Sequence, residues 1–160
     1  MAAKLGVWSS VSTGHVLGGN ELESGLFMFG TERVNKMAPI KSYIKEGLRP
    51  ALEGTMWSGW DTAFFWIGKS ITRKDETYKR VWNAPEALDR QEALWASTLW
   101  AAQQVAEDKT LGSVEVGKEA DLVVIDKDYM TVPADEIEKI KPLLTMVGGK
   151  IVYEVAGGLQ

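Results

Sequence analysis

The chain has 160 residues, of which 45% are hydrophobic and 25% are charged, and this composition indicates a folded domain rather than a disordered segment. The formal net charge is −4 and the positive residues are scattered, so the sequence has no basic stripe of the kind that binds nucleic acid. No run reaches the ~18 apolar residues of a membrane helix, and the absence of cysteine excludes disulfides, thiolate metal ligands and a cysteine nucleophile, as is usual in a cytoplasmic protein.

The first part of the chain is predicted to alternate strands and helices. Residues 5–11 are short, β-leaning and bounded by glycine, which predicts a strand, and a loop is expected over 12–25. Helical spacing over 32–46 predicts a helix that begins or bends at Pro39. Residues 48–53 predict a second strand, and the order strand, helix, strand favours a parallel sheet.

The middle of the chain is predicted to be mainly helical. An aromatic loop over 54–60 precedes a helix over 61–71 that is apolar enough to be buried, and a charged, exposed loop is expected over 74–82. The clearest helix begins near Asp89, because Glu92 follows at capping-box spacing. This helix is apolar on nearly all sides, which predicts that it is buried.

The last part of the chain has the pattern of a small β region. Residues 120–126 form a continuous apolar strand, and a helical turn is expected over 133–137. Residues 143–147 and 150–155 alternate well, and the two glycines at 148–149 predict a two-residue hairpin turn between them.

Two C-terminal motifs resemble those of a known family. Residues 111–126, LGSVEVGKEADLVVID, resemble the C-terminal signature of the amidohydrolase superfamily, and residues 144–154, LTMVGGKIVYE, resemble its closing hairpin. Upstream, residues 5–11, the Thr72-Arg73 pair and residues 88–102 are similar to the branch that includes the N-substituted formamide deformylases.

The resemblance implies an α/β fold in two parts. Residues 1–110 would be the last strands and helices of a (β/α)8 metal-dependent hydrolase barrel, and residues 111–156 would supply strands of a small composite β-sandwich. Residues 5–11 would be the seventh barrel strand and residues 48–53 the eighth. Barrels of this kind carry the active site at the C-terminal ends of their strands.

The resemblance also implies a hydrolase of carbon–nitrogen bonds other than peptide bonds, in which a metal-activated water attacks an amide-type small molecule. The family holds its divalent metal, with zinc expected here, through histidines whose positions all precede Met1. His15 is the single histidine of this sequence, too few for a zinc site. The fragment is therefore expected to bind no metal, to be inactive alone, and to require the missing N-terminal barrel or a homo-oligomer partner.

The family places a catalytic, metal-binding aspartate after the eighth strand, and here that position is Thr55, a poor base and a weak ligand. Glu53 could replace the aspartate, although a shift of two strand residues moves its side chain about 6.6 Å deeper. The alternative for Glu53 is a structural or ion-paired carboxylate. Asp61, which follows on the next loop or helix, is a weaker candidate.

Further candidates have both a functional and a structural interpretation. His15 would contact substrate at the barrel mouth or lie on a surface loop, and Trp57 and Trp60 would line a substrate pocket or pack in the core. Arg73 is expected to hold loops by pairing with carboxylates, and Asp121 to fix a turn.

Two other functions remain open from sequence. Thr55 and the single histidine favour a non-catalytic binding or structural protein derived from the amidohydrolase fold. A self-sufficient small domain is the third possibility.

Overall fold

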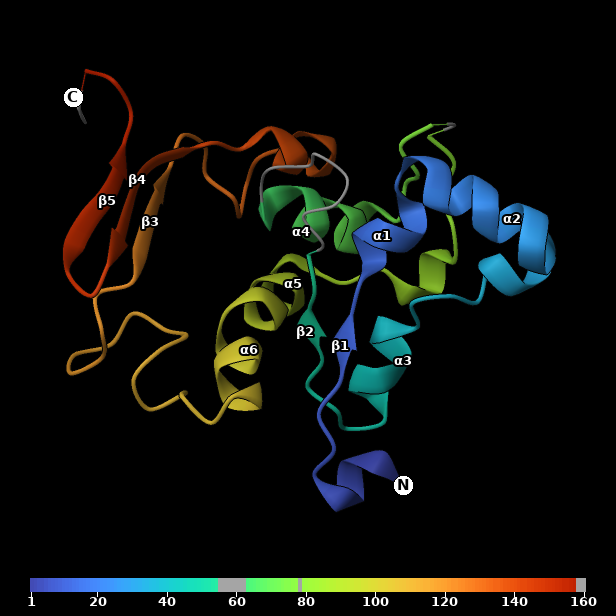
Figure 1. The fold of residues 1–160 in the computed structure, drawn as a ribbon, viewed down its shortest axis with the longest axis horizontal. Helices are drawn as coiled ribbons and strands as arrows, with labels where there is room; N and C mark the ends of the chain where they lie inside the picture. The colour runs from blue at the N-terminus through green and yellow to red at the C-terminus, as the bar shows by residue number, and fades with distance from the viewer. Residues whose placement is uncertain (55–62, 78, 158–160) are drawn as a thin grey trace.

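The computed structural model describes residues 1–54, 63–77 and 79–157. The chain is a mixed α/β protein with two separate sheets: a two-stranded parallel sheet among helices, and a three-stranded antiparallel sheet near the C-terminus (Figure 1). No helix in these ranges is long and apolar enough to cross a bilayer.

The parallel pair consists of β1 (Ser10–Val11) and β2 (Ala51–Leu52), in the register Ser10 to Ala51 and Val11 to Leu52. Both predicted strands and their parallel pairing are confirmed, but each strand has only two residues. Residues 2–5 instead form the 3-10 helix η1 (Ala2–Leu5), which ends at Gly6 with a φ of 66°. Pro50 has no N–H to donate, so the ladder begins after it.

The loop predicted over 12–25 is wrong, because this stretch is helical. Helix α1 (Thr13–Leu17) is followed by α2 (Gly19–Val34), which is kinked at Gly30, where φ is 75° and ψ is 163°. Leu17, Leu22 and Val34 from these helices are buried in a cluster with Trp82. This burial outweighs the low helix propensity of the glycines along the segment.

The next two helices largely agree with prediction. Helix α3 (Ile40–Lys45) begins directly after Pro39, although the helical pattern predicted from residue 32 is divided between α2 and α3. Helix α4 (Ala63–Thr72) is buried, as predicted.

The segment 74–82 is not simply an exposed loop. Lys74 and Val81 form an isolated antiparallel bridge, and both Asp75 and Trp82 are buried. The Asp75 carboxylate accepts hydrogen bonds from the backbone N–H of Arg80 and from Nε1 of Trp82, at 2.9 and 3.0 Å. A buried carboxylate with two donors is tolerated because its hydrogen bonds replace those to water.

The helix predicted from Asp89 exists, with its capping box, but it is two helices: α5 (Arg90–Ser97) and α6 (Leu99–Gln104). The break is at Thr98, whose φ and ψ are −132° and −87°. The hydroxyl of Thr98 donates a hydrogen bond to the backbone carbonyl of Leu94. A side chain that binds this carbonyl competes with the backbone N–H groups of the helix, which favours a break. The prediction of burial on nearly all sides is wrong, since Leu94 and Trp95 are each 39% exposed. The 3-10 helix η3 (Ala84–Glu86) precedes α5.

The C-terminal region agrees closely with its prediction. Its sheet has the order β3 (Leu122–Ile125), β4 (Pro142–Val147), β5 (Lys150–Glu154), and the 3-10 helix η4 (Ala134–Lys139) lies between β3 and β4. The turn at 148–149 has two positive φ values, 54° and 77°, as a type I′ hairpin turn requires. The predicted role of Asp121 is confirmed, because its Oδ1 accepts from the backbone N–H of Gly148 at 2.7 Å.

The main core cluster crosses the boundary predicted near residue 110. It joins Val11 of β1 and Ile67 of α4 with Tyr129, Ile137 and Ile140 from the C-terminal region. Figure 1 shows η4 beside α4, which is the contact that ties the two regions together. The division at residue 110 stays a prediction.

Candidate functional site

The parallel pair carries two polar side chains on one face: Ser10 is the first residue of β1, and Glu53 directly follows the carboxyl end of β2. Val11 and Leu52 pack against the main core, so alternation along the strands directs Ser10 and Glu53 to the opposite face. The Ser10 hydroxyl donates to Oε2 of Glu53 at 3.2 Å, and both residues are exposed. The face opposite the main core, which we call the open face, therefore carries the exposed side chains of Ser10 and Glu53, although Ala51, the register partner of Ser10, is buried.

Three hydroxyl groups lie around β1 in addition to Ser10. The side-chain oxygens of Ser9, Ser12 and Thr13 are buried and have no hydrogen-bond partner within the described ranges. A buried hydroxyl without a partner costs roughly 1–3 kcal/mol. These hydroxyls were not predicted as site residues, although the run SSVST at 9–13 is visible in the sequence as a polar stretch beside the strand.

Trp66 of α4 separates the segments that follow the two strands. A Cβ added to Gly14, on α1 after β1, would lie 2.1 Å from a ring carbon of Trp66. A Cβ added to Gly54, after β2, would lie 2.6 Å from Nε1 of the same ring. Both glycines are needed for this close approach, and the indole fixes the spacing between the two strand ends.

Arg73 is buried at the end of α4 and holds a neighbouring loop. Its guanidinium donates to the backbone carbonyls of Trp82, Ala38 and Met37 at 3.0, 3.2 and 3.1 Å. The predicted loop-holding role is confirmed, but the expected carboxylate pairing is replaced by hydrogen bonds to carbonyls. Burial lowers the pKa of Arg73 to about 10, although the charge of Glu86 opposes this shift.

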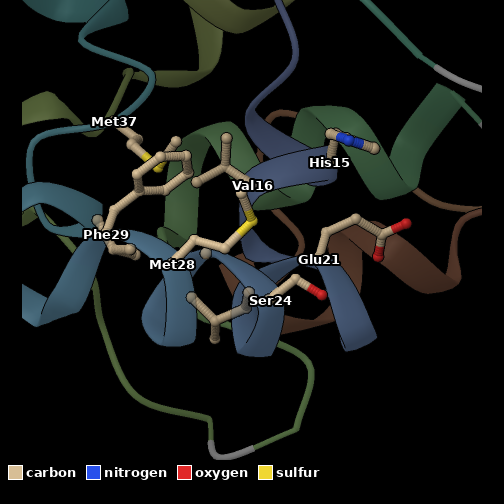
Figure 2. A pocket seen from close by; sticks show the side chains of 10 residues that line it. His15, Val16, Glu21, Ser24, Met28, Phe29 and Met37 are labelled. Carbon is tan, nitrogen blue, oxygen red and sulfur yellow. The ribbon is translucent and has the colours of Figure 1, made fainter.

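An open cavity of about 310 Å³ lies between α1, α2 and the loop that contains Met37. His15 lies at its edge on α1, so it is on a helix rather than on the predicted loop, and its side chain is exposed. Figure 2 shows the polar ends of His15, Glu21 and Ser24 toward one end of the cavity and Phe29 and Met37 toward the other. Glu53 is not among the residues that line this cavity.

The remaining predicted site residues lie outside the described part of the chain. These are Thr55, Trp57, Trp60 and Asp61. Their proposed roles stay predictions.

A resident metal does not fit the donor groups found here. Within residues 1–54, 63–77 and 79–157, no three His, Cys, Asp or Glu side chains lie close enough together to hold a metal ion. A protein zinc site uses three or four such ligands. We therefore assign no metal ligand to the described residues.

Comparison with known proteins gives a consistent family. A family model described as the amidohydrolase family matches residues 1–153. The chain is 29% identical over 123 residues to an N-substituted formamide deformylase of Arthrobacter pascens, which covers 76% of this chain and 22% of the relative. It is also 29% identical over 90 residues to a 5-methylthioadenosine/S-adenosylhomocysteine deaminase of Thermodesulfovibrio yellowstonii, which covers 56% of this chain and 20% of the relative.

Solved structures agree in fold. A prolidase complexed with N-methylphosphonate-L-proline superimposes with a TM-score of 0.62 at 21% identity, covering 96% of this chain and 37% of that one. The chain thus spans 22% and 20% of the two curated relatives and just over a third of the solved neighbour.

Proposed function

Because this chain belongs to the amidohydrolase family, we propose that it forms the C-terminal part of a hydrolase that breaks carbon–nitrogen bonds other than peptide bonds in small amide-type molecules. The observation that carries the proposal is the parallel β1–β2 pair, in which Glu53 directly follows the carboxyl end of β2, where family-type barrels have their sites, and accepts a hydrogen bond from Ser10. The names of the two curated relatives support it, since deformylation and deamination both break such bonds.

In this proposal β1 and β2 are the seventh and eighth strands of a (β/α)8 barrel, and residues 111–156 contribute to a small β-sandwich. The parallel pairing supports the assignment, as does the packing of Val11 and Leu52 against the main core. The open face of Ser10 and Glu53 would then be the barrel interior. The missing strands would come from an N-terminal barrel segment or from another copy of the chain.

The chain's own residues would orient substrate and accept a proton. Glu53 is the carboxylate that directly follows β2 in the parallel pair, and its hydrogen bond from Ser10 holds it on the open face. His15, Trp57 and Trp60 are the proposed substrate contacts. The divalent metal that the resemblance implies, zinc, is assigned to ligands outside this chain.

The test compares the 160-residue chain with the same chain extended by whatever reading frame precedes its Met1 codon. We expect the extended protein to hydrolyse secondary amides and to hold zinc, and the shorter chain to do neither. Zinc content by atomic absorption and amine release from an amide panel give the two readouts. One zinc per short chain with chelator-sensitive activity would contradict the proposal, as would unrelated coding sequence upstream in every frame.

A non-catalytic binding or structural protein is the second candidate, because Thr55 stands where the family has its aspartate. The substitution Thr55→Asp in the extended protein separates the two candidates. Hydrolysis that appears only with Thr55→Asp would favour the second candidate, whereas hydrolysis by the unsubstituted protein that is lost with Glu53→Gln would favour the first.

A further inference from the structure

The cavity beside α1 and α2 has a division of chemistry that indicates a ligand class. Six of its lining residues are apolar and form the floor and the far end: Val16, Leu22, Met28, Phe29, Val34 and Met37. Its volume, about 310 Å³, is at the small end of the range for ligand sites. A compact aromatic or branched aliphatic group fits such a space.

The polar groups of the cavity are gathered at its other end. His15, Glu21 and Ser24 direct their polar atoms to one side, as Figure 2 shows. None of the three side chains has a hydrogen bond or ion pair to another residue in the described ranges. Glu21 is the one carboxylate on the lining, and the described lining has no lysine or arginine. This end is therefore complementary to a positively charged group or to a hydrogen-bond donor.

The floor of the cavity is anchored to the rest of the protein. Leu22 and Val34 are 1% and 2% exposed and pack on Trp82. The carbonyl of Met37 accepts a hydrogen bond from buried Arg73, which fixes the loop at the far end. These contacts hold the buried part of the lining in place before a ligand enters.

We propose that this cavity binds a compact apolar group whose attached nitrogen, as an amine or an amide N–H, faces Glu21, Ser24 and His15. The role of this nitrogen rests on the proposed function: it would belong to the carbon–nitrogen bond that is broken, or to the amine that is released. This role specifies the substrate class as amides that carry an apolar substituent on nitrogen. His15 and Val16 of the lining lie on α1, the helix that follows the carboxyl end of β1.

The binding test uses four probes and the 160-residue chain with isotope-labelled methionine methyl groups. The chain has six methionines, and Met28 and Met37 line the cavity. We expect phenethylamine and N-phenethylacetamide to shift the methyl resonances of these two residues. Hydrocinnamate, which places a carboxylate beside Glu21, should bind at least about tenfold more weakly than phenethylamine. Ethylamine, which lacks the apolar group, should shift neither resonance.

Matched variants assign the binding to the cavity. Phe29 lines it and Phe27 does not, although both are phenylalanines on α2, and Phe27 is 93% exposed. Phe29→Ala should weaken phenethylamine binding about tenfold, and Phe27→Ala should change it by less than about twofold. Glu21→Gln should weaken the amine about tenfold and leave the neutral amide within about twofold, whereas Glu23→Gln, on the same helix and off the lining, should affect neither ligand.

Three results would overturn the assignment: unmoved resonances of Met28 and Met37 with all four probes, equal effects of Phe27→Ala and Phe29→Ala, or hydrocinnamate binding as tight as that of the amine. The proposed function fails in a different way. If the probes bind as expected but the extended protein hydrolyses no amide, the cavity assignment stands without it. If N-phenethylacetamide is hydrolysed and Phe29→Ala leaves KM unchanged, the cavity assignment alone is wrong.

Discussion

The two sheets of this protein are both incompletely covered, and their open faces differ in chemistry. The open face of the β1–β2 pair bears Ser10 and Glu53, which are readily hydrated. In the C-terminal sheet, register places Leu122 with Ile151 on one face and Val123 with Tyr153 on the other. These four side chains are 37%, 55%, 52% and 47% exposed.

The difference indicates which sheet needs a partner. A polar open face can remain in water at little cost and is available for chemistry, whereas an apolar face loses about 25 cal/mol for each Å² left in contact with water. Exposed strands β3 and β5 also have unpaired edges. We therefore expect the C-terminal sheet to direct association and the parallel pair to contribute to the site.

The largest expected effect concerns association. The 160-residue chain should form oligomers or aggregates, and Val123→Lys combined with Ile151→Lys, one substitution on each face, should shift it strongly toward monomer. Light scattering with size-exclusion chromatography measures the change. Ser10→Lys, on the open face of the parallel pair, is the control and should leave the association state as it was. If the unsubstituted chain is a monodisperse monomer, the comparison between the sheets is wrong.

The second effect concerns the indole that spaces the strand ends of the parallel pair. Trp66 is 7% exposed, so Trp66→Ala should lower the free energy of unfolding by about 3–5 kcal/mol. Trp95→Ala is the matched control, because Trp95 is 39% exposed, and it should cost about 1 kcal/mol. Urea unfolding in the background of the less associating variant gives both values. Equal losses would mean that Trp66 does not fix this region.

The third effect is a pH dependence that originates near α3. Burial raises the pKa of Glu86. This effect is outweighed by hydrogen bonds from the Ser42 hydroxyl and from the backbone N–H groups of Ser42 and Lys41, together with the positive charge of Arg73. The pKa of Glu86 is therefore lowered from its usual value of 4.5. The folded state thus binds this proton less tightly than the unfolded state. Its stabilisation is present above pH 4.5 and is lost as the pH falls through the folded-state pKa.

The variant Glu86→Gln isolates this contribution. Urea midpoints measured from pH 7 down to pH 3 should fall less steeply for Glu86→Gln than for the unsubstituted protein. An unchanged slope would show that Glu86 does not carry the dependence. Glu154→Gln, an exposed acid on β5, serves as the control and should retain the original slope.

The sequence predicted the two sheets to different extents. The C-terminal sheet follows from local patterns, namely alternation in 143–147 and 150–155 and the two glycines between them. Helices α1 and α2 could not be predicted in that way, because their glycines weaken the helical signal and their stability comes from burial against Trp82, which is distant in sequence. The helix break at Thr98 could not be predicted either, because the apolar residues typical of a helix are present on both sides of it.

The candidate site was predictable only where a family motif or a rare residue pointed to it. Glu53 and His15 were identified in this way, and the structure places them on the open strand face and at the cavity edge respectively. The cavity lining was not predictable, because Met28, Phe29 and Met37 converge through the kink at Gly30 and through the hydrogen bond from Arg73 to the Met37 carbonyl. The spacing of residues along the sequence reveals neither of these features.

The smallest expected effect concerns the turn of the C-terminal sheet. Asp121 Oδ1 accepts a hydrogen bond of 2.7 Å from the N–H of Gly148, in the two-residue turn that sets the register of β4 and β5. Asp121→Ala should lower the free energy of unfolding by about 1 kcal/mol, the net value of one partly solvated hydrogen bond. Glu154→Ala removes an acid of β5 whose side chain has no hydrogen bond to the described residues, and it should cost less than about 0.5 kcal/mol. Because the apolar faces rather than the turn are expected to drive association, Asp121→Ala should leave the oligomeric state unchanged. A change in oligomeric state with Asp121→Ala would show that the turn, and not the exposed faces, controls how the sheet meets its partner.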